Sequence, residues 1–246
     1  MASSDNFAVV TGVSRGIGAA IAEKLIRDGW KVTGTYNRTE PSAALAESKN
    51  FSSVRVDLGS NDQLYEKLHP LVSENTPAVL INNAGISEDS DMEAGDDEWL
   101  ELWDRTQQIN LRASALLSKW CLPAWKEQQK GRLINIASRA AYRGDTAEYA
   151  AYAASKAGLV AFGKSLLRNY GKHGLEVYCV APGFVHTDMA EESAKVHGED
   201  YLTSDIPMGY LPSPEEVAET VAFLASGKSP QLSGSTLHLN GGSYML

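Results

Sequence analysis

Tyr152 and Lys156 are the residues whose types and spacing could do chemistry, because they stand four positions apart in the chain. Residues at i and i+4 of a helix lie on one face, so both side chains can act on one ligand. A nearby ammonium group lowers the pKa of a phenol from its ordinary value of about 10. The pair therefore suits proton transfer to or from a carbonyl or an alcohol, although a solvated helix face could carry the same spacing. Tyr149 has no cation four residues further on, where Ala153 stands.

The chain that would position this pair has 246 residues, of which 43% are hydrophobic. A chain of this length and composition can bury a sizeable core. No internal repeat, low-complexity tract or flexible linker divides the sequence, so we expect one domain over residues 1–246. No apolar run reaches the roughly 20 residues of a membrane span, and the polar start of the chain lacks the pattern of an export signal. We therefore expect a cytoplasmic protein with no membrane partner.

Charge and cysteine content exclude several kinds of partner. The formal net charge is −9, and nine acids without a base lie between Ser87 and Asp104. The rest of the chain is balanced, so no basic patch invites nucleic acid. We interpret the acidic run as a solvated loop followed by the first turn of a helix, where carboxylates are favourable. Cys121 and Cys179 have no partner at metal-ligand spacing, so we expect neither a metal site nor a disulfide.

A cluster of glycines follows the first apolar run. Residues 7–10 predict a strand, which a glycine-rich turn connects to a helix that ends near residue 29. Gly12, Gly16 and Gly18 let the backbone turn tightly and approach a pyrophosphate, which the free N–H groups of the helix would bind. The spacing G-x-x-x-G-x-G differs from the commoner G-x-G-x-x-G, and an ordinary turn is the alternative. The strand-to-helix setting favours a dinucleotide site.

The end of the second predicted strand, residues 31–36, indicates which dinucleotide would bind. Asn37 and Arg38 follow this strand, where such folds meet the adenosine ribose. An acid there would bind a free 2′-hydroxyl, and none is present. Arg38 and Arg15 could instead clamp a 2′-phosphate, which favours NADP(H) over NAD(H), although either arginine alone could be a solvated surface residue.

Strand-like and helix-like segments alternate along the rest of the chain, which predicts an α/β fold with a doubly wound parallel sheet of about seven strands flanked by helices. Asp57, at the end of the third strand, could accept a hydrogen bond from adenine, and Ser138 follows the fifth strand. A helical region is expected from Asp96 to about Gln129. After the sixth strand a loop of roughly thirty residues leads to a helix at Pro214, and a loop of that length suggests a functional lid. The predicted strands cover residues 7–10, 31–36, 54–58, 78–81, 132–137, 175–180 and 234–239.

Six motifs in this order resemble the short-chain dehydrogenase/reductase family over nearly the full chain. They are the T-G-x-x-x-G-I-G turn from Thr11, Asn-Asn-Ala-Gly at 82–85, Asn110, Ser138, Tyr152 with Lys156, and Pro182-Gly183. Residues 181–189 and 237–246 are similar to the β-ketoacyl-acyl carrier protein reductases of that family. The resemblance implies a Rossmann-type fold and an NADPH-dependent oxidoreductase that acts on a carbonyl or secondary alcohol, as a 3-oxoacyl thioester reductase does.

The same resemblance implies a catalytic tetrad. Tyr152 would be the general acid, Ser138 would orient the carbonyl, Lys156 would bind the nicotinamide ribose and tune Tyr152, and Asn110 would hold a water that relays protons. The predicted cofactor-binding residues, taken from the motifs and from the two arginines, are Gly12, Ser14, Arg15, Gly16, Ile17, Gly18, Asn37, Arg38, Asp57, Leu58, Asn83, Ala84, Gly85, Tyr152, Lys156, Pro182, Gly183, Val185 and Thr187.

Two departures from the family pattern leave the substrate open. Ser138 and Tyr152 are fourteen positions apart, one more than is usual in these reductases, so the loop that borders the substrate differs. The basic positions with which such reductases dock acyl carrier protein fall at Gln129 and His173. Acyl carrier protein is thus an open question as a partner, whereas the resemblance and the apolar tail Tyr244–Leu246 imply a homotetramer. The alternatives are a reductase of a sugar, steroid or diketone carbonyl, and a protein that senses a dinucleotide without turnover.

Overall fold

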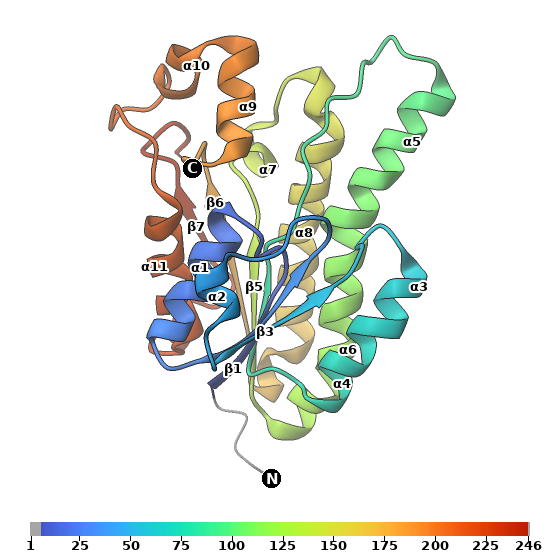
Figure 1. Cartoon of the computed structure of the whole chain (residues 1–246), viewed down its shortest axis with the longest axis vertical. Coiled ribbons are helices and arrows are strands. Elements are labelled where there is room, and N and C mark those ends of the chain that lie inside the picture. The colour runs from blue at the N-terminus through green and yellow to red at the C-terminus, as the bar shows by residue number, and fades with distance from the viewer. Residues whose placement is uncertain (1–5, 246) are drawn as a thin grey trace.

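The computed structural model describes residues 6–245, so the polar start of the chain up to Asp5 and Leu246 of the apolar tail lie outside the described residues. One sheet of seven strands runs through the molecule in the order β3-β2-β1-β4-β5-β6-β7, and every neighbouring pair is parallel. Helices cover both faces of the sheet (Figure 1), which confirms the predicted fold class. The strands are β1 (Phe7–Val10), β2 (Lys31–Tyr36), β3 (Phe51–Arg55), β4 (Val79–Asn82), β5 (Gly131–Ile136), β6 (Leu175–Pro182) and β7 (Thr236–Leu239).

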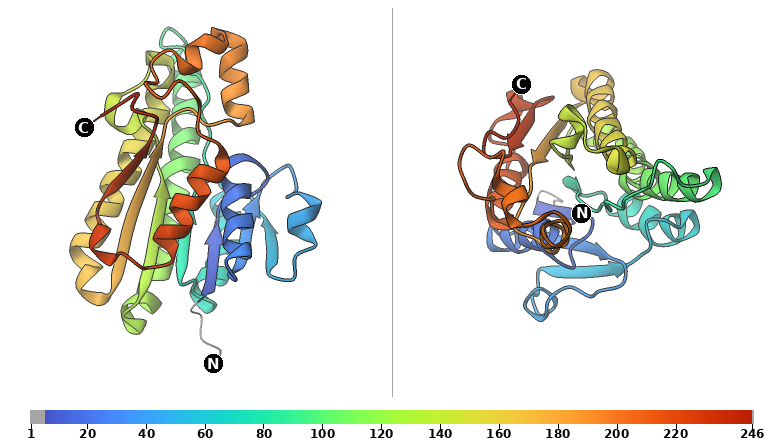
Figure 2. Two further views of the ribbon diagram at one scale, coloured as in Figure 1. Left: turned by 90° about the vertical axis from the view of Figure 1, so that its left-hand side faces the viewer. Right: turned by 90° about the horizontal axis from the view of Figure 1, so that it is seen from above.

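The helices lie in two layers, one on each face of the sheet, as Figure 2 shows from above. One layer contains α1 and α11, and the other contains α4, α6 and α8. Within residues 6–245 no helix is both long and apolar enough to cross a lipid bilayer. The α-helices are α1 (Gly16–Arg27), α2 (Ala43–Ala46), α3 (Asn61–Gln63), α4 (His69–Glu74), α5 (Asp96–Gln107), α6 (Ala113–Gln128), α7 (Ala140–Arg143), α8 (Ala150–Tyr170), α9 (Asp188–His197), α10 (Glu199–Thr203) and α11 (Pro214–Ala225).

The unbroken apolar runs of the central strands follow from burial on both faces. Successive side chains of a strand point to opposite faces of its sheet. In β4, Val79 and Ile81 therefore pack against the layer of α1 and α11, whereas Leu80 between them packs against the layer of α6. A strand that is buried on both faces needs an apolar residue at every position, so apolar and polar residues do not alternate in the sequence of β4.

The winding of the chain reverses at β1, which lies between β2 and β4. Open α/β sheets bind ligands at such a point, in the crevice beyond the carboxyl ends of the strands. Since all seven strands are parallel, these ends share one edge, which is the upper end of the sheet in Figure 1. The segments that follow β1, β2, β4, β5 and β6 therefore meet there, although they are far apart in the sequence.

Six strands lie within two residues of their predicted bounds, but the prediction for the third strand was wrong. This strand covers Phe51–Arg55 rather than residues 54–58, so Asp57 lies two residues beyond its end. The strand is at the edge of the sheet and pairs only with β2, in a register that joins Phe51 to Val32. Ser52 and Ser53 are exposed on this edge, and their polarity hid the first half of the strand from a search for apolar runs.

The helical region predicted from Asp96 is present as α5, a π-helical turn at Gln108–Arg112 and α6, which follow one another without a break. It ends where Gln129 adopts a left-handed conformation with φ of 51°. The sequence carried no sign of the π-helical turn. Such turns occur often at functional sites, and this one contains Asn110.

Residues 184–213, between β6 and Pro214, were predicted to be a loop, and we call this segment the lid. The prediction was wrong in one respect, because the lid contains α9 and α10. Four buried residues, Ala190, Leu202, Ile206 and Leu211, form a small core of their own, against which Phe184 packs. A segment with its own core can hold short helices that would be marginal in isolation. The lid lies above the carboxyl ends of the strands in Figure 1. The helix predicted at Pro214 is present as α11, with a capping box formed by Ser213 and Glu216.

Candidate active site

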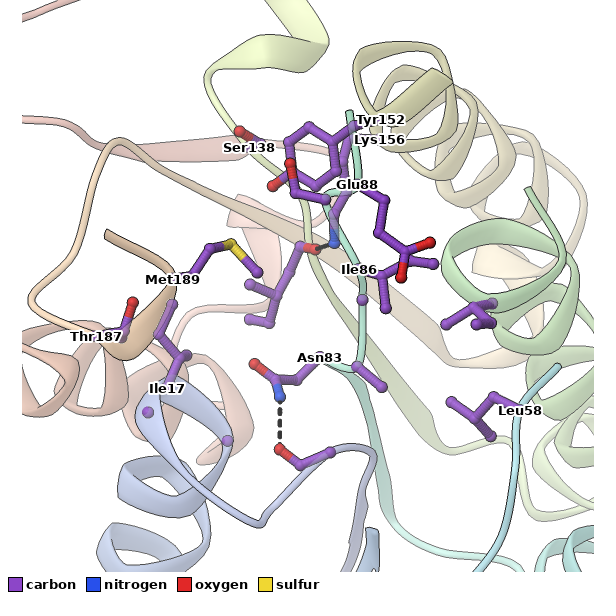
Figure 3. A pocket seen from close by; sticks show the side chains of 18 of the residues that line it. Ile17, Leu58, Asn83, Ile86, Glu88, Ser138, Tyr152, Lys156, Thr187 and Met189 are labelled. Carbon is purple, nitrogen blue, oxygen red and sulfur yellow. Dashed lines mark hydrogen bonds between the residues drawn. The ribbon is translucent and has the colours of Figure 1, made fainter. Parts of the chain in front are cut away.

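One cavity of about 1340 Å³ lies at the carboxyl edge of the sheet and is lined by every residue that the sequence predicted to bind the cofactor. It also contains Ser138, so of the four predicted catalytic residues only Asn110 does not line it. Figure 3 shows Ile17 and Thr187 on one side of this cavity, and Ser138 and Tyr152 at the end away from the glycine turn. The fold thus joins the predicted dinucleotide site and the predicted catalytic residues in one continuous space.

The glycine turn leaves room for a ligand at the start of α1. Gly12 and Gly16 have positive φ angles of 74° and 57°, which favour glycine. A Cβ atom at Gly18 would lie 1.9 Å from the Gly12 carbonyl oxygen, so the turn and the helix pack at a distance that only glycine allows. No side chain caps the first turn of α1. Its free N–H groups and the positive end of the helix dipole therefore face the cavity as an anion site.

Asn83 fixes the end of β4 against the end of β1. Its Nδ2 atom donates to the carbonyl oxygens of Thr11 (2.9 Å) and Gly12 (3.0 Å). In return, the Thr11 hydroxyl oxygen accepts from the backbone N–H groups of Asn83 and Ala84, both at 3.0 Å. These bonds cross the point where the winding reverses. They hold the glycine turn and the Asn-Asn-Ala-Gly turn in one rigid unit.

Tyr152 and Lys156 project from the first turns of α8 toward the end of β5, as their spacing predicted. The Lys156 ammonium group lies 5.8 Å from the centre of the Tyr152 ring and donates to the carbonyl oxygen of Ile136 at 2.9 Å. Ser138 follows β5, and its hydroxyl oxygen accepts from the N–H of Ala140 at 3.1 Å. The two hydroxyl groups are close enough for Ser138 to lower the pKa of Tyr152. Two hydroxyl groups and one ammonium group therefore meet at one place in the cavity.

The pKa of Tyr152 differs from the expectation based on its spacing to Lys156. Burial raises this pKa above its ordinary value, and the hydrogen bond from Ser138 lowers it by less. Burial also lowers the pKa of Lys156 to about 8, since a buried ammonium group loses hydration. The expected net lowering of the tyrosine pKa is thus wrong for this structure. Tyr152 is a protonated phenol at neutral pH, which is the state that a general acid requires.

Asn110 is fully buried in the π-helical turn. Its Nδ2 atom donates to the Ile86 carbonyl oxygen (2.9 Å) and to the Ser155 hydroxyl (3.0 Å), and its Oδ1 atom accepts from the Ile86 N–H (2.8 Å). The residue therefore connects the segment after β4 to α8 directly beside Lys156. Its predicted contact with a relay water stays a prediction.

The end of the cavity that was predicted to hold adenosine is formed by the turns after β1, β2 and β3. Arg15 and Arg38 both line it, and no carboxylate lies among residues 36–39. Arg15 forms an ion pair with Asp188 of the lid at 3.0 Å, and both side chains are more than half exposed. The Asp57 carboxylate accepts from the N–H of Gly59 at 2.8 Å. Its predicted bond to adenine remains a prediction.

Several residues of the cavity were not singled out from the sequence. Arg139, directly after Ser138, is buried and contacts the lid. Phe184 and Tyr201 of the lid also line the cavity, with ring centres 5.9 Å apart. The signal that could have found Arg139 is a long basic side chain immediately after the serine, in a loop one residue longer than usual.

Metal chemistry finds no support in the described residues. In that part of the chain no group of three or more His, Cys, Asp or Glu side chains is arranged to hold a metal ion. Cys121 and Cys179 are both buried free thiols, and burial raises the pKa of each, to about 11 for Cys179. They behave as small apolar residues, Cys121 in the core beside α4 and α6 and Cys179 in a smaller cluster with Ala137, Val160 and Ala181.

Comparison with known proteins agrees with this geometry. Residues 12–244 match the sequence model of a family described as enoyl-(acyl carrier protein) reductase. The chain is 38% identical to 3-oxoacyl-[acyl-carrier-protein] reductase FabG of Escherichia coli (strain K12) over 245 residues, which cover 97% of each chain. It is 37% identical to the proteins of the same name from Salmonella typhimurium, over 100% of each chain, and from Vibrio harveyi, over 97% of each chain.

Proposed function

Because the chain belongs to the short-chain dehydrogenase/reductase family of oxidoreductases, we propose that it reduces the carbonyl of a 3-oxoacyl thioester with NADPH. The observation that carries this proposal is the meeting of Ser138, Tyr152 and Lys156 in the same cavity as the glycine turn. The names of the relatives, 3-oxoacyl-[acyl-carrier-protein] reductases, support the substrate class.

The cavity fits a nicotinamide dinucleotide by the chemistry of its residues. The uncapped start of α1 and the close packing of Gly18 suit a pyrophosphate, and Arg15 with Arg38 suits a 2′-phosphate. Lys156 and Tyr152 are placed to hold the nicotinamide ribose. Bound NADPH would supply the hydride that reduces the carbonyl carbon.

The side chains of this protein would supply and guide the proton. The Ser138 hydroxyl oxygen accepts from the N–H of Ala140, and when substrate binds its single proton would turn from Tyr152 to the substrate oxygen. Tyr152 gives its phenolic proton to that oxygen as the carbon accepts hydride, so a ketone becomes an alcohol with one hydride and one proton added. The Lys156 ammonium group, held by the Ile136 carbonyl oxygen, lowers the cost of the phenolate that remains.

A second candidate is reduction of a carbon–carbon double bond, because the matching family is described as an enoyl reductase. Ser138 and Tyr152 favour the ketone, since two hydroxyl groups that converge on one point suit an oxygen atom that gains negative charge. Reduction of a small carbonyl without a thioester remains the other alternative.

The proposal is tested by the rate of NADPH consumption with four substrates carried on a small thiol or free in solution. They are a 3-oxoacyl thioester, the corresponding 2-enoyl thioester, a diketone and a sugar carbonyl. We expect the highest kcat/KM for the 3-oxoacyl thioester and at least about a hundredfold slower turnover of it by Tyr152→Phe. A clear preference for the enoyl thioester or for a carbonyl without a thioester would contradict the proposal.

A further inference from the structure

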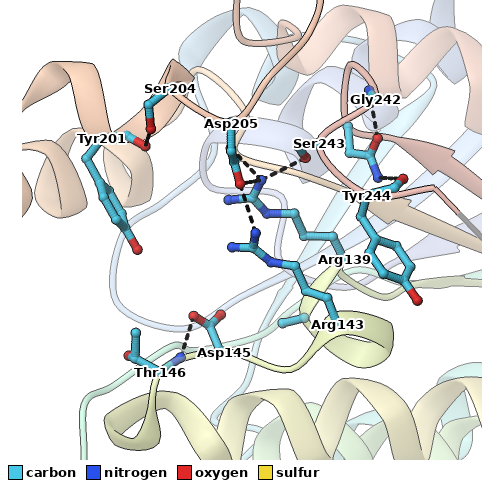
Figure 4. A network of polar contacts seen from close by, with 12 residues as sticks. Arg139, Arg143, Asp145, Thr146, Tyr201, Ser204, Asp205, Gly242, Ser243 and Tyr244 are labelled. Carbon is cyan, nitrogen blue, oxygen red and sulfur yellow. Dashed lines mark hydrogen bonds and ion pairs between the residues drawn. The ribbon is translucent and has the colours of Figure 1, made fainter.

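The side chain of Arg139 connects three segments that meet at the active site (Figure 4). Its Nη1 atom lies 3.2 Å from each carboxylate oxygen of Asp205, which follows α10 in the lid, and 2.7 Å from the hydroxyl of Ser243 near the C-terminus. Its guanidinium carbon lies 4.6 Å from the centre of the Phe184 ring. One arginine next to Ser138 thus contacts the first residue of the lid, a later residue of the lid and the C-terminal segment.

Burial makes this contact costly to break. The Arg139 side chain is only 6% exposed, whereas the carboxylate of Asp205 is 39% exposed. If Asp205 moved away, a guanidinium charge would remain buried without its counter-ion, which is far more unfavourable than the loss of a surface ion pair. The backbone N–H of Arg139 also donates to the Pro182 carbonyl oxygen at 2.9 Å. The arginine therefore cannot follow the lid outward without leaving β6.

Asp205 holds both ends of the short helix that follows Ser138. Its Oδ2 atom accepts a second bond, from Nη1 of Arg143 at 2.8 Å. Arg139 precedes α7 and Arg143 ends it, so one carboxylate of the lid fixes the helix at its two ends. The first N–H of the same helix, that of Ala140, donates to the Ser138 hydroxyl oxygen. The orientation of Ser138 therefore depends on the position of α7, which depends on the lid.

We propose that Arg139 and Asp205 are positioning residues that fasten the lid to the loop carrying Ser138, so that covering the cavity and orienting the Ser138 hydroxyl occur together. The inference rests on the proposed catalytic role of Ser138. When the lid is in place, Phe184 and Tyr201 form a wall of the cavity and α7 presents the Ala140 N–H to Ser138. When the Asp205 carboxylate leaves, both arrangements are lost.

The test is the variant Asp205→Asn, which keeps the size of the side chain and removes its charge. The matched control is Glu176→Gln, because Glu176 pairs with Arg132 at 3.1 Å near the other end of β5, and the Arg132 side chain is only 12% exposed. Both variants leave a largely buried arginine without its carboxylate. We expect Asp205→Asn to lower kcat for the 3-oxoacyl thioester by about ten- to hundredfold, because misplaced catalytic groups cost that much. Glu176→Gln should lower Tm by a similar amount and leave kcat unchanged.

The double variant Arg139→Met with Asp205→Leu separates positioning from stability. Replacing both charges by apolar groups removes the buried unpaired charge, so Tm should return toward the wild-type value. The connection between lid and loop stays broken, so kcat should stay low. A wild-type kcat in Asp205→Asn, or recovery of kcat together with Tm in the double variant, would overturn the inference.

The rate of tryptic cleavage after Lys195, an exposed residue of α9, measures how readily the lid leaves its place. This measurement needs no substrate turnover. We expect faster cleavage in Asp205→Asn than in Glu176→Gln, and equal rates would overturn the coupling. The variant Tyr152→Phe tests the proposed function separately. Wild-type turnover in that variant would contradict the catalytic role of Tyr152. The cleavage rates of Asp205→Asn and Glu176→Gln would still test whether Asp205 holds the lid in place.

Discussion

In the proposed reaction, the Tyr152 hydroxyl gives up a proton where water does not stabilise the anion that remains. Burial raises its pKa, and Ser138 offsets part of that rise by a hydrogen bond. The group is therefore protonated when the substrate arrives, and the charge that develops on it is met by hydroxyl and ammonium groups already in place. Such preorganised groups act more strongly in a site that excludes water than they would in solution.

We predict that Tyr152→Phe lowers kcat by roughly 10²–10⁴-fold, the usual contribution of general acid catalysis, while binding of NADPH stays nearly unchanged. Phenylalanine removes the proton donor and leaves the ring and Lys156 in place. Steady-state kinetics and a fluorescence titration with NADPH measure the two effects. Tyr149→Phe is the control, because Tyr149 lines the same cavity without a lysine one turn away. Parallel losses of kcat in the two variants would contradict the assignment.

Lys156 links folding stability to pH. Burial lowers its pKa to about 8, against 10.5 as its ordinary value. Between these values the unfolded chain binds more protons than the folded one, so this lysine makes the free energy of unfolding rise with pH in that window. Below pH 8 both states are charged and the full penalty of the buried charge applies.

We therefore predict that Lys156→Met is more stable than the wild type at neutral pH. The difference in the free energy of unfolding should shrink by about 3 kcal/mol as the pH rises from 8 to 10.5. Urea unfolding of the cofactor-free proteins at several pH values measures this difference, and comparison of the two proteins cancels the other groups that titrate. A difference that does not change with pH would show that Lys156 is not buried as a charged group.

At the scale of elements, we expect the turns after β1 and β2 to decide which dinucleotide the cavity accepts. Arg38 follows β2 and lines the cavity, with no carboxylate beside it to bind a ribose diol. Arg15, in the glycine turn, pairs with Asp188 of the lid, but both groups are more than half exposed. An exposed pair of this kind contributes little, so Arg15 can exchange its partner for a phosphate.

We predict that the enzyme prefers NADPH to NADH, and that Arg38→Ala lowers kcat/KM for NADPH by about tenfold with little effect on NADH. A charge-assisted hydrogen bond contributes about 1.5–3 kcal/mol, and exposure reduces this value. Kinetics with both cofactors measure the effect, with Arg27→Ala as a control at the far end of α1. Equal use of NADH by the wild type, or equal losses with both cofactors in Arg38→Ala, would contradict the role of this arginine.

At the scale of the whole molecule, the acidic segment contributes carboxylates to the wall of the cavity. Glu88, Asp89 and Asp104 of the acidic segment line it, together with Asp145 from the loop after α7. Glu88 is paired with Arg105, whereas Asp89 and Asp145 are exposed. Gln129 and His173 stand at the positions with which related reductases dock acyl carrier protein. They lie near the starts of β5 and β6, at the opposite end of the sheet from Ser138 of the same chain. We therefore expect these carboxylates, rather than Gln129 and His173, to affect the approach of a charged partner to the cavity.

We predict that the protein reduces a 3-oxoacyl group on a small thiol at least as readily as the same group on acyl carrier protein. Carrier proteins of fatty acid synthesis are acidic, and like charges slow association. The measurement is kcat/KM for both forms at low and high salt, since screening acts beyond about 8 Å at physiological ionic strength. Added salt should improve use of the carrier form. A strong advantage of the carrier form that salt weakens would contradict this prediction.

A homotetramer is predicted from the family resemblance and from the apolar C-terminal residues. Met245 is 79% exposed in one chain, and Phe223 of α11 is 45% exposed. Two-fold contacts between copies would cover such residues, as is usual in symmetric oligomers. Light scattering at working concentration measures the mass, with Met245→Lys as the variant that should weaken assembly. A monomeric wild-type protein would contradict the prediction.

The sequence by itself determined the class of the fold, because unbroken apolar runs such as residues 79–81 are required wherever a strand is buried on both faces. It also singled out Tyr152 and Lys156 as the proposed catalytic pair, since the i, i+4 spacing of a helix places them on one face whatever packs around it. The glycine turn was visible for a similar reason, as Gly18 has no room for a Cβ atom. These features depend on local geometry.

Only the tertiary structure decided the pKa values and the contacts of the lid. The spacing of Tyr152 and Lys156 predicted a lowered tyrosine pKa, but burial by distant segments has the larger effect and raises it. The ion pair of Arg139 with Asp205 joins residues 66 positions apart, and nothing in either neighbourhood marks the other. Desolvation and long-range pairing depend on which segments the fold brings together, and no local pattern in the chain records them.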